Sequence, residues 1–137
     1  MRHRVFGNQL GRNTKQAKAL YRGLTKSLFL HGRIQTTLAK AKAAVSMVDR
    51  VITFAKKNNV SAKREVAKIL GGVDLIDKIF NEIGPRFAGR NSGFSRIIKL
   101  GDRLSDSTKL AILELVEGAQ KEEPKVEVKA TKKKKTK

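Results

Sequence analysis

The chain contains no cysteine and no tryptophan among its 137 residues. Without cysteine it has no disulfide framework, no thiolate metal ligand and no thiol nucleophile. Only 5% of the residues are aromatic, and base stacking on exposed rings is therefore not expected to be its main way of binding a partner. No apolar run approaches the ~20 residues that a bilayer-spanning helix needs. Catalysis by a thiol and insertion into a membrane are both disfavoured.

Acidic residues are missing from the first third of the sequence, where Asp49 is the first to appear. The 48 residues before it hold ten Lys or Arg and therefore carry a charge of +10. Soluble domains usually intersperse charges of both signs over their surface. A segment whose charges are all positive predicts a surface that lies against a densely negative partner, either nucleic acid or an anionic membrane.

The whole chain has a formal net charge of +19 and a pI of about 10.7. Residues 49–120 contribute only +4, whereas residues 121–137 contribute +5, and the excess is thus concentrated at the two ends. Such a charge repels itself in a compact fold unless a partner neutralises it. The length suits one domain with a modest core. The basic N-terminus lacks the apolar segment of a secretory signal, and we expect a cytoplasmic protein.

Glycine and apolar periodicity divide the sequence into three regions. Residues 1–12 read as a basic extended arm, residues 13–117 as a single folded domain, and residues 118–137 as a disordered lysine-rich tail. A terminus without a specific role is the alternative for the arm, because composition alone does not show what it contacts. The tail is either a solubilising extension or a further contact with a polyanion.

A helix is expected from Asn13 or Thr14, either of which is a good N-cap, to about Leu30. At 100° per residue, one face of this helix is apolar and the opposite face carries only cations. The apolar face consists of Ala17, Leu20, Tyr21, Leu24 and Leu28, and the cationic face of Lys15, Lys18, Arg22 and Lys26. A solvated lysine face is the alternative, but no acid on this helix balances the cations.

In the rest of the domain we expect one strand, then three helices, then a hairpin of two strands. A strand is expected at 33–37, a long helix at 38–57 that ends at Asn58-Asn59, and a short helix that starts with Ser61 as N-cap. A further helix, capped by Asp74, is expected to end at Gly84-Pro85. A Gly-rich basic loop follows at 84–93, and strands at 94–100 and 109–117 form a hairpin. These elements predict an α+β fold.

No arrangement of residues in the sequence predicts catalysis or metal binding. His3 and His31 are the only histidines, and neither has the spacing of a metal ligand. A P-loop motif is absent, and the Gly-rich loop lacks the flanking strand and helix of a dinucleotide site. Its Arg86 and Arg90 fit phosphate contacts better. We therefore expect no catalytic residue, no metal, no cofactor and no small-molecule substrate.

An interfacial membrane helix is the rival explanation for the cations at 15–26, because such helices also oppose cations to apolar residues. However, the basic residues continue through the arm, through 33–42 and through 84–96, where irregular or extended structure is expected. A nucleic acid that several elements follow explains this spread better than one helix on a lipid surface does.

RNA is favoured over DNA as the partner. The sequence shows no helix-turn-helix with a polar recognition helix, no zinc finger and no aromatic-rich sheet. Lys and Arg contacts to phosphate suit a folded RNA, which offers many backbone surfaces. A nucleoid or general polyanion-binding protein remains the alternative, although no wedge for minor-groove intercalation is evident.

Three stretches of the sequence resemble the bacterial-type large-subunit ribosomal proteins of the L-seventeen family. They are Met1-Arg2-His3-Arg4 with Leu10-Gly11-Arg12-Asn13, then Ala19 to Lys42, then Leu75 to Lys99 with Asn81-Glu82-Ile83-Gly84-Pro85-Arg86-Phe87-Ala88 at its centre. Each motif alone is modest, but their order and spacing over about residues 1–117 are specific.

This resemblance implies a two-layer α+β domain, in which a small mixed three-stranded sheet is covered by about four helices. It further implies a structural role on large-subunit ribosomal RNA, near the polypeptide exit and beside other ribosomal proteins. The arm and the first helix are then the main RNA contacts, assisted by the loop at 86–96. Together with the charge pattern, the predicted RNA-binding residues are Arg2, His3, Arg4, Arg12, Lys15, Lys18, Arg22, Lys26, Arg33, Lys40, Lys42, Arg86, Arg90 and Arg96.

Overall fold

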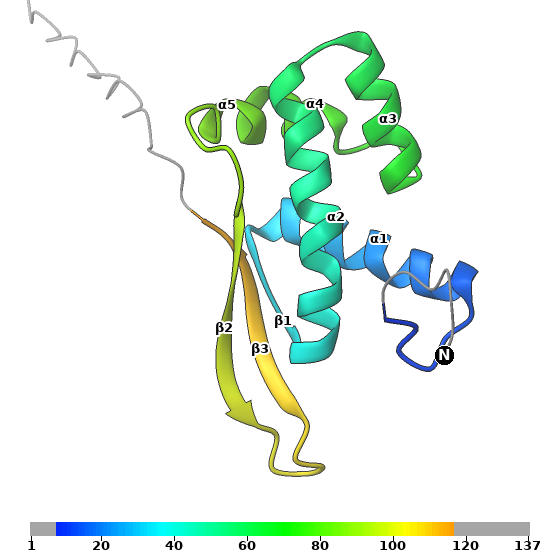
Figure 1. Cartoon of the computed structure of the whole chain (residues 1–137), viewed down its shortest axis with the longest axis vertical. Helices are drawn as coiled ribbons and strands as arrows, with labels where there is room; N and C mark the ends of the chain where they lie inside the picture. Colours follow the sequence, from blue (N-terminus) through cyan, green and yellow to red (C-terminus); the bar gives the residue numbers. More distant parts are fainter. Residues whose placement is uncertain (1–7, 117–137) are drawn as a thin grey trace, which may run out of the picture.

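The computed structural model describes residues 8–116, in which helices cover one face of a three-stranded sheet (Figure 1). This arrangement confirms the predicted α+β class. The elements in chain order are α1 Thr14–His31, β1 Arg33–Thr37, α2 Leu38–Lys57, α3 Val60–Leu70, α4 Ile76–Lys78, the π-helix η1 Ile79–Ile83, α5 Gly84–Arg86, β2 Ser95–Asp102 and β3 Lys109–Leu115. Residues 1–7 and the predicted tail at 118–137 lie outside the described part of the chain.

Local capping fixes both ends of α1, as predicted. The Asn13 side chain accepts a hydrogen bond from the Gln16 N–H at 2.8 Å, and the Gln16 side chain accepts one from the Asn13 N–H, which completes a capping box. At the other end, Gly32 adopts a φ of +75° and its N–H donates to the Leu28 carbonyl at 2.8 Å. Residues 8–12 of the predicted arm form a turn before α1, closed by the Arg12 N–H on the Gln9 carbonyl.

The second helix, α2, is the centre of the core. Its buried side chains recur at helical spacing and form the broad apolar stripe that the sequence predicts. They are Ala41, Ala44, Val48, Val51, Ile52 and Ala55. The small alanines allow close approach of the sheet and of α1 and α3, all of which contact α2. Asn58, in a left-handed conformation with a φ of +43°, ends the helix.

The sheet has the order β1-β3-β2 and is antiparallel at both pairings. The expectation of a mixed sheet is therefore wrong. Strands β1 and β2 run in the same direction, but β3 lies between them, so they never form a parallel ladder. Ile34, Leu113 and Ile97 share one row on the face toward the helices. The next row, Gln35, Ile112 and Ile98, lies on the opposite face, because side chains alternate along a strand.

Two expectations about the helices after α2 are wrong. Asn59, not Ser61, caps α3, because its side chain accepts a hydrogen bond from the Ala62 N–H at 2.7 Å. Asp74 makes no capping bond, and the following helix runs through Gly84-Pro85 to Arg86 instead of ending there. The π-helix η1 widens the turn just before Pro85, where an α-helix would clash with the proline ring.

Two aromatic rings close the core where α2 ends. Phe87 and Phe94 are both buried and meet edge to face, with ring centroids 5.4 Å apart. The Phe94 N–H donates to an Asp49 carboxyl oxygen at 3.3 Å, which ties the start of β2 to α2. Burial raises the pKa of the Asp49 carboxyl above its usual 3.8, and the bond from Phe94 only partly offsets that rise.

Candidate nucleic-acid interface

The predicted RNA-binding residues within the described part of the chain fall into three groups. The first lies on α1 and the beginning of α2, where Lys18 and Lys42 line the same groove. Arg12 belongs with it, in the turn before α1, where its Nη1 donates to the Leu10 carbonyl at 2.8 Å. The second, Arg86 and Arg90, lies by the opposite end of α2 (Figure 1). The third, Arg33 and Arg96, lies on the sheet face turned away from the helices. Arg2, His3 and Arg4 lie outside the described residues.

The first group occupies helices that the capping box and the core hold in place. Lys15 and Lys18 are exposed, and Lys26 is half-buried further along α1. On α2, Lys42 is exposed and Lys40 is half-buried. Within residues 8–116 none of these lysines takes part in an ion pair or a side-chain hydrogen bond. Their charges are therefore not neutralised by any side chain of the described residues.

Arg22 differs from its neighbours on the cationic face, because it is held by α3. Its Nε donates to the Ile69 carbonyl at 2.9 Å and its Nη2 to the Lys68 carbonyl at 3.0 Å. These carbonyls belong to the last turn of α3, which has no internal donors left for them. Gly71 follows with a φ of +71°, and a Cβ there would come within 3.1 Å of the guanidinium. Arg22 thus joins α1 to α3, a role that the sequence did not predict.

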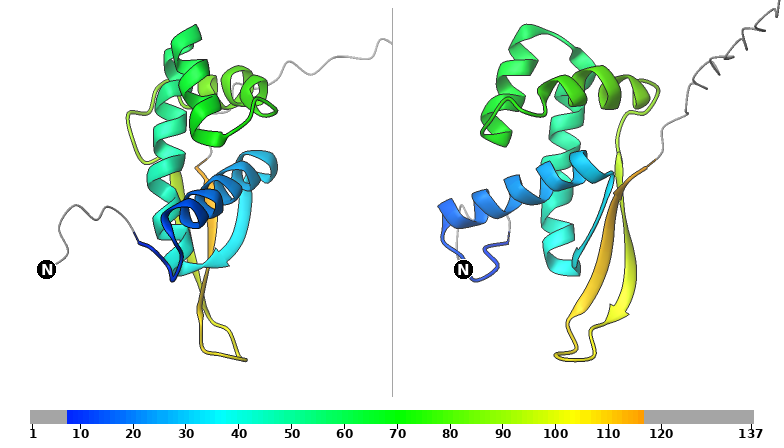
Figure 2. Two further views of the ribbon diagram at one scale, coloured as in Figure 1. Left: turned by 90° about the vertical axis from the view of Figure 1, so that its right-hand side faces the viewer. Right: turned by 180° about the vertical axis from the view of Figure 1, so that it is seen from behind.

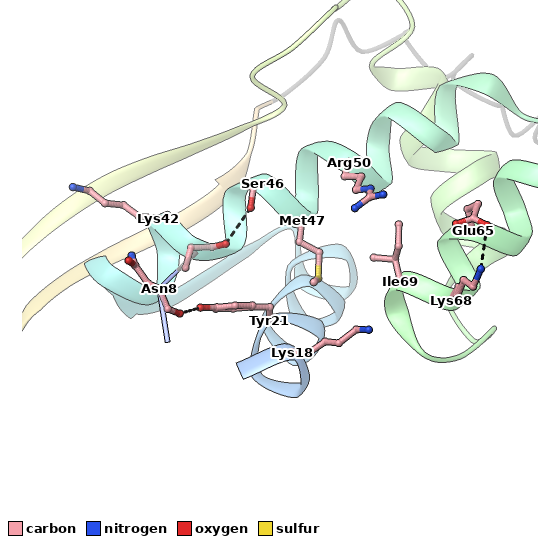
Figure 3. A pocket seen from close by; sticks show the side chains of 11 residues that line it. Asn8, Lys18, Tyr21, Lys42, Ser46, Met47, Arg50, Glu65, Lys68 and Ile69 are labelled. Atoms are coloured by element: carbon pink, nitrogen blue, oxygen red, sulfur yellow. Dashed lines mark hydrogen bonds and ion pairs between the residues drawn. The ribbon is translucent and has the colours of Figure 1, made fainter. Parts of the chain in front are cut away.

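Helices α1, α2 and α3 enclose a groove of about 740 Å³ (Figure 3). Met47 and Ile69 lie between the helices, and the Tyr21 ring extends from the Met47 side toward Asn8. The Tyr21 hydroxyl donates to the Asn8 carbonyl, which fixes the ring at one end. The complete lining is Asn8, Lys18, Tyr21, Lys42, Ala43, Ser46, Met47, Arg50, Glu65, Lys68 and Ile69.

Sequence reasoning missed Arg50 and Lys68, which bring two further cations to this groove. Both follow the first acidic residue, Asp49, so they fall outside the acid-free segment that predicts the cationic surface. A signal was available for Arg50. Lys42, Ser46 and Arg50 are spaced at i, i+4 and i+8, which places them on one face of a helix. Lys68 could be assigned only once α3 was known to lie against α1.

In the second and third groups, one arginine of each pair already makes a hydrogen bond or an ion pair within the protein. Arg90 donates from its Nε to the Ser92 carbonyl at 3.3 Å, while its own carbonyl accepts a hydrogen bond from Lys56. Arg96 is paired with Glu114, which lies across the sheet between Arg96 and Arg33. Arg86 and Arg33 are exposed and make no such contact within the described residues.

A model of one protein family matches residues 20–116, described as ribosomal protein L17. The chain belongs to the ribosomal protein L17 family. It is 49% identical over 132 residues to the large ribosomal subunit protein bL17 of Thermodesulfovibrio yellowstonii, an alignment that covers 95% of this chain and 99% of the relative. The corresponding protein of Koribacter versatilis is 46% identical over 121 residues, with 88% of this chain and 74% of the relative covered.

A third relative, the bL17 protein of a Hydrogenobaculum species, is 45% identical over 118 residues. That alignment covers 85% of this chain and the whole of the relative. The L17 family consists of structural, non-enzymatic components of the ribosome. Membership therefore confirms the family resemblance seen in the sequence, and it confirms the expectation that the chain is not an enzyme.

The described part of this L17-family chain offers little for other chemistry. Within residues 8–116, no group of three or more His, Cys, Asp or Glu side chains is arranged to hold a metal ion. His31 is exposed at the last position of α1. No helix in the same range has both the length and the apolar content that crossing a membrane requires.

Proposed function

We propose that the chain is a structural constituent of the large ribosomal subunit, in which it binds ribosomal RNA mainly through phosphate contacts. One observation carries this proposal: from α1 to the middle of α2 there is no acidic residue, and exposed Lys15, Lys18 and Lys42 make no ion pair within residues 8–116. Family membership supports it, because the relatives are named as proteins of the large ribosomal subunit.

The mechanism is phosphate neutralisation on a rigid scaffold. RNA segments that would repel one another can pack when lysines between them replace the bound counterions. Each phosphate contact is expected to add roughly 0.7–0.9 to the log–log slope of affinity against salt. Because α1 is capped at both ends and packed on the core, its lysines are presented without first having to order the helix. In this role the protein supports subunit assembly and translation in the cytoplasm.

The position near the polypeptide exit, implied by the resemblance, is part of the same proposal. The β2–β3 hairpin projects away from the helices (Figure 2), and its exposed side chains include Ile98, Leu100 and Leu104. Such residues suit contact with neighbouring ribosomal proteins better than contact with phosphate. A photo-reactive group placed at Leu104 should therefore cross-link to a large-subunit protein. Cross-linking to RNA alone would contradict this part of the proposal.

The first experiment is co-sedimentation of the tagged chain with ribosomal particles, followed by a wash at high salt. We expect retention on the large subunit at about one copy per particle, because an integrated component is held by many contacts at once. General binding to polyanions weakens steeply with salt. Loss of the chain at modest salt, or its spread over all RNA and DNA fractions, would instead identify a general polyanion-binding protein.

A further inference from the structure

The groove between α1, α2 and α3 has a feature that phosphate binding alone does not explain. Its lining combines cations with the apolar side chains of Met47 and Ile69 and the flat ring of Tyr21. Lysines that contact the backbone of a regular RNA helix need only protrude, and a concave apolar surface adds nothing to such a contact. The volume of about 740 Å³ lies within the ~300–1,000 Å³ of small-ligand sites.

The charges around this groove favour an anionic occupant. Glu65 is its one acid, and it is already paired with Lys68 at 3.6 Å. Lys18 from α1 and Arg50 from α2 have no ion pair within residues 8–116 and reach toward the same space (Figure 3). A guanidinium binds a phosphate through two parallel N–H bonds, which gives Arg50 a preferred ligand geometry.

We infer that this groove binds one unpaired nucleotide of the RNA, with its base against the apolar lining and its flanking phosphates on Lys18 and Arg50. The inference rests on the proposed RNA-binding function. An unpaired base presents a flat face, which stacks on aromatic and apolar side chains. The bond from Tyr21 to the Asn8 carbonyl fixes the ring before the base arrives, which lowers the ordering cost of binding.

The test uses Met47 as the reporter, because the chain has only one other methionine, Met1, and the spectrum is therefore simple. In the full chain with ¹³C-labelled methionine methyl groups, the Met47 methyl lies in the groove, and a base stacked beside it shifts its resonance. The probes are a single-stranded oligouridylate, an abasic strand of equal length and an RNA duplex with as many phosphates. We expect the oligouridylate alone to shift Met47, and to bind about tenfold more tightly than the abasic strand.

Two variants separate the groove from the general charge effect. Arg50→Gln should weaken oligouridylate binding about tenfold more than Lys57→Gln, which removes the same charge from an exposed lysine at the far end of α2. The Lys57→Gln chain should keep the Met47 shift at saturation. Equal effects of both variants, or equal shifts of Met47 by the abasic strand, the duplex or an oligo-aspartate peptide of matched charge, would overturn the inference.

The failure of this inference can be told apart from failure of the proposed function. If the wild-type chain stays on the large subunit through the high-salt wash but oligouridylate does not shift Met47, only the nucleotide site is refuted. If the wild-type chain washes off, the structural role in the subunit is refuted, whatever the methyl resonance shows.

Discussion

Arg22 lies where a phosphate contact is expected, but its side chain holds two helices together. On the helical wheel it belongs to the cationic face of α1, but its guanidinium satisfies two carbonyls at the end of α3. Removing it would leave these carbonyls without their charged donor and would loosen the contact between the two helices. Its contribution is therefore expected in the free energy of unfolding as well as in RNA affinity.

Arg22→Gln should lower the free energy of unfolding by about 1–2 kcal/mol, since hydrogen bonds from a charged donor are lost. Lys26→Gln is the matched control, because the Lys26 side chain makes no hydrogen bond or ion pair within residues 8–116, and its effect should stay within about 0.5 kcal/mol. Urea denaturation of the free protein measures both changes. Equal midpoints for the two variants would show that the Arg22 contact does not stabilise the fold.

Asp49 gives a pH-dependent prediction. Burial raises the pKa of its carboxyl in the folded state, so folding favours the protonated form. Its contribution to stability is then greatest below the usual value of 3.8 and is lost as the pH rises through the raised folded value. Asp49→Asn keeps an oxygen for the Phe94 N–H and carries no charge, and it should raise the melting temperature at neutral pH.

Thermal unfolding at several pH values tests this prediction for Asp49. The difference between Asp49→Asn and the wild type should shrink toward zero as the pH falls below 3.8, where both side chains are neutral. A constant difference at all pH values would mean that the amide acts through packing and not through the buried charge. Asp106 offers a contrast, because the hydrogen bonds from Arg103 and then Thr108 hold its pKa well below the usual range.

At the scale of the elements, α1 was predictable because its signals are local. The Asn13 cap, the apolar face and the glycine after His31 all lie within or next to the helix itself. The extension of the last helix through Pro85 was not predictable in the same way. A Cβ at Gly84 would lie 3.2 Å from the Ala55 carbonyl, so that glycine serves the approach of α2 and not the end of a helix.

The cationic face of α1 can be tested as a unit. Replacing Lys15, Lys18 and Lys26 together by Gln should reduce the log–log salt slope of RNA binding by about 2–3, if each lysine contacts one phosphate. Helicity should be retained, because the capping box and the core face are untouched and a repulsive row of like charges is removed. Circular dichroism and binding titrations at several salt concentrations measure the two effects.

A matched variant controls for net charge in that experiment. Lys57, Lys99 and Lys109 are exposed lysines on α2, β2 and β3 that the sequence did not assign to RNA binding. Their joint replacement by Gln removes the same charge. The α1 assignment fails if this control flattens the salt slope as much as the α1 variant does.

At the scale of the molecule, the sequence predicts an anionic partner but does not reveal the arrangement of the cations. Which strands are neighbours, and therefore that Arg33 and Arg96 flank Glu114, depends on pairings between distant segments. The groove likewise combines side chains from three helices, and how these helices pack together cannot be read from local sequence signals. Lys18 and Lys42 were predicted because they belong to the acid-free segment. Arg50 could have been added from its helical spacing to Lys42, whereas Lys68 required the fold.

The net charge of +19 predicts that added salt has opposite effects on the stability of the free protein and on its affinity for RNA. Raising the salt concentration from about 0.1 M to 1 M shortens the screening length from about 10 Å to 3 Å and weakens self-repulsion. The melting temperature of the free protein should therefore rise, while its affinity for RNA falls. Thermal unfolding and RNA binding in the same buffers test this, and a free protein destabilised by salt would contradict it.

The central position of β3 also bears on how the chain folds during its synthesis. Strand β1 is made early, but its partner β3 is the last of the described strands, so that Arg33 lies opposite Glu114 in the ladder across most of the described chain. Helices α1 and α2 can form from local contacts as they emerge, whereas the sheet must wait until residues 109–115 are available. The lysines of α1 and α2 are therefore accessible before the sheet can form. A chain cut short of β3 would lose both strand pairings at once.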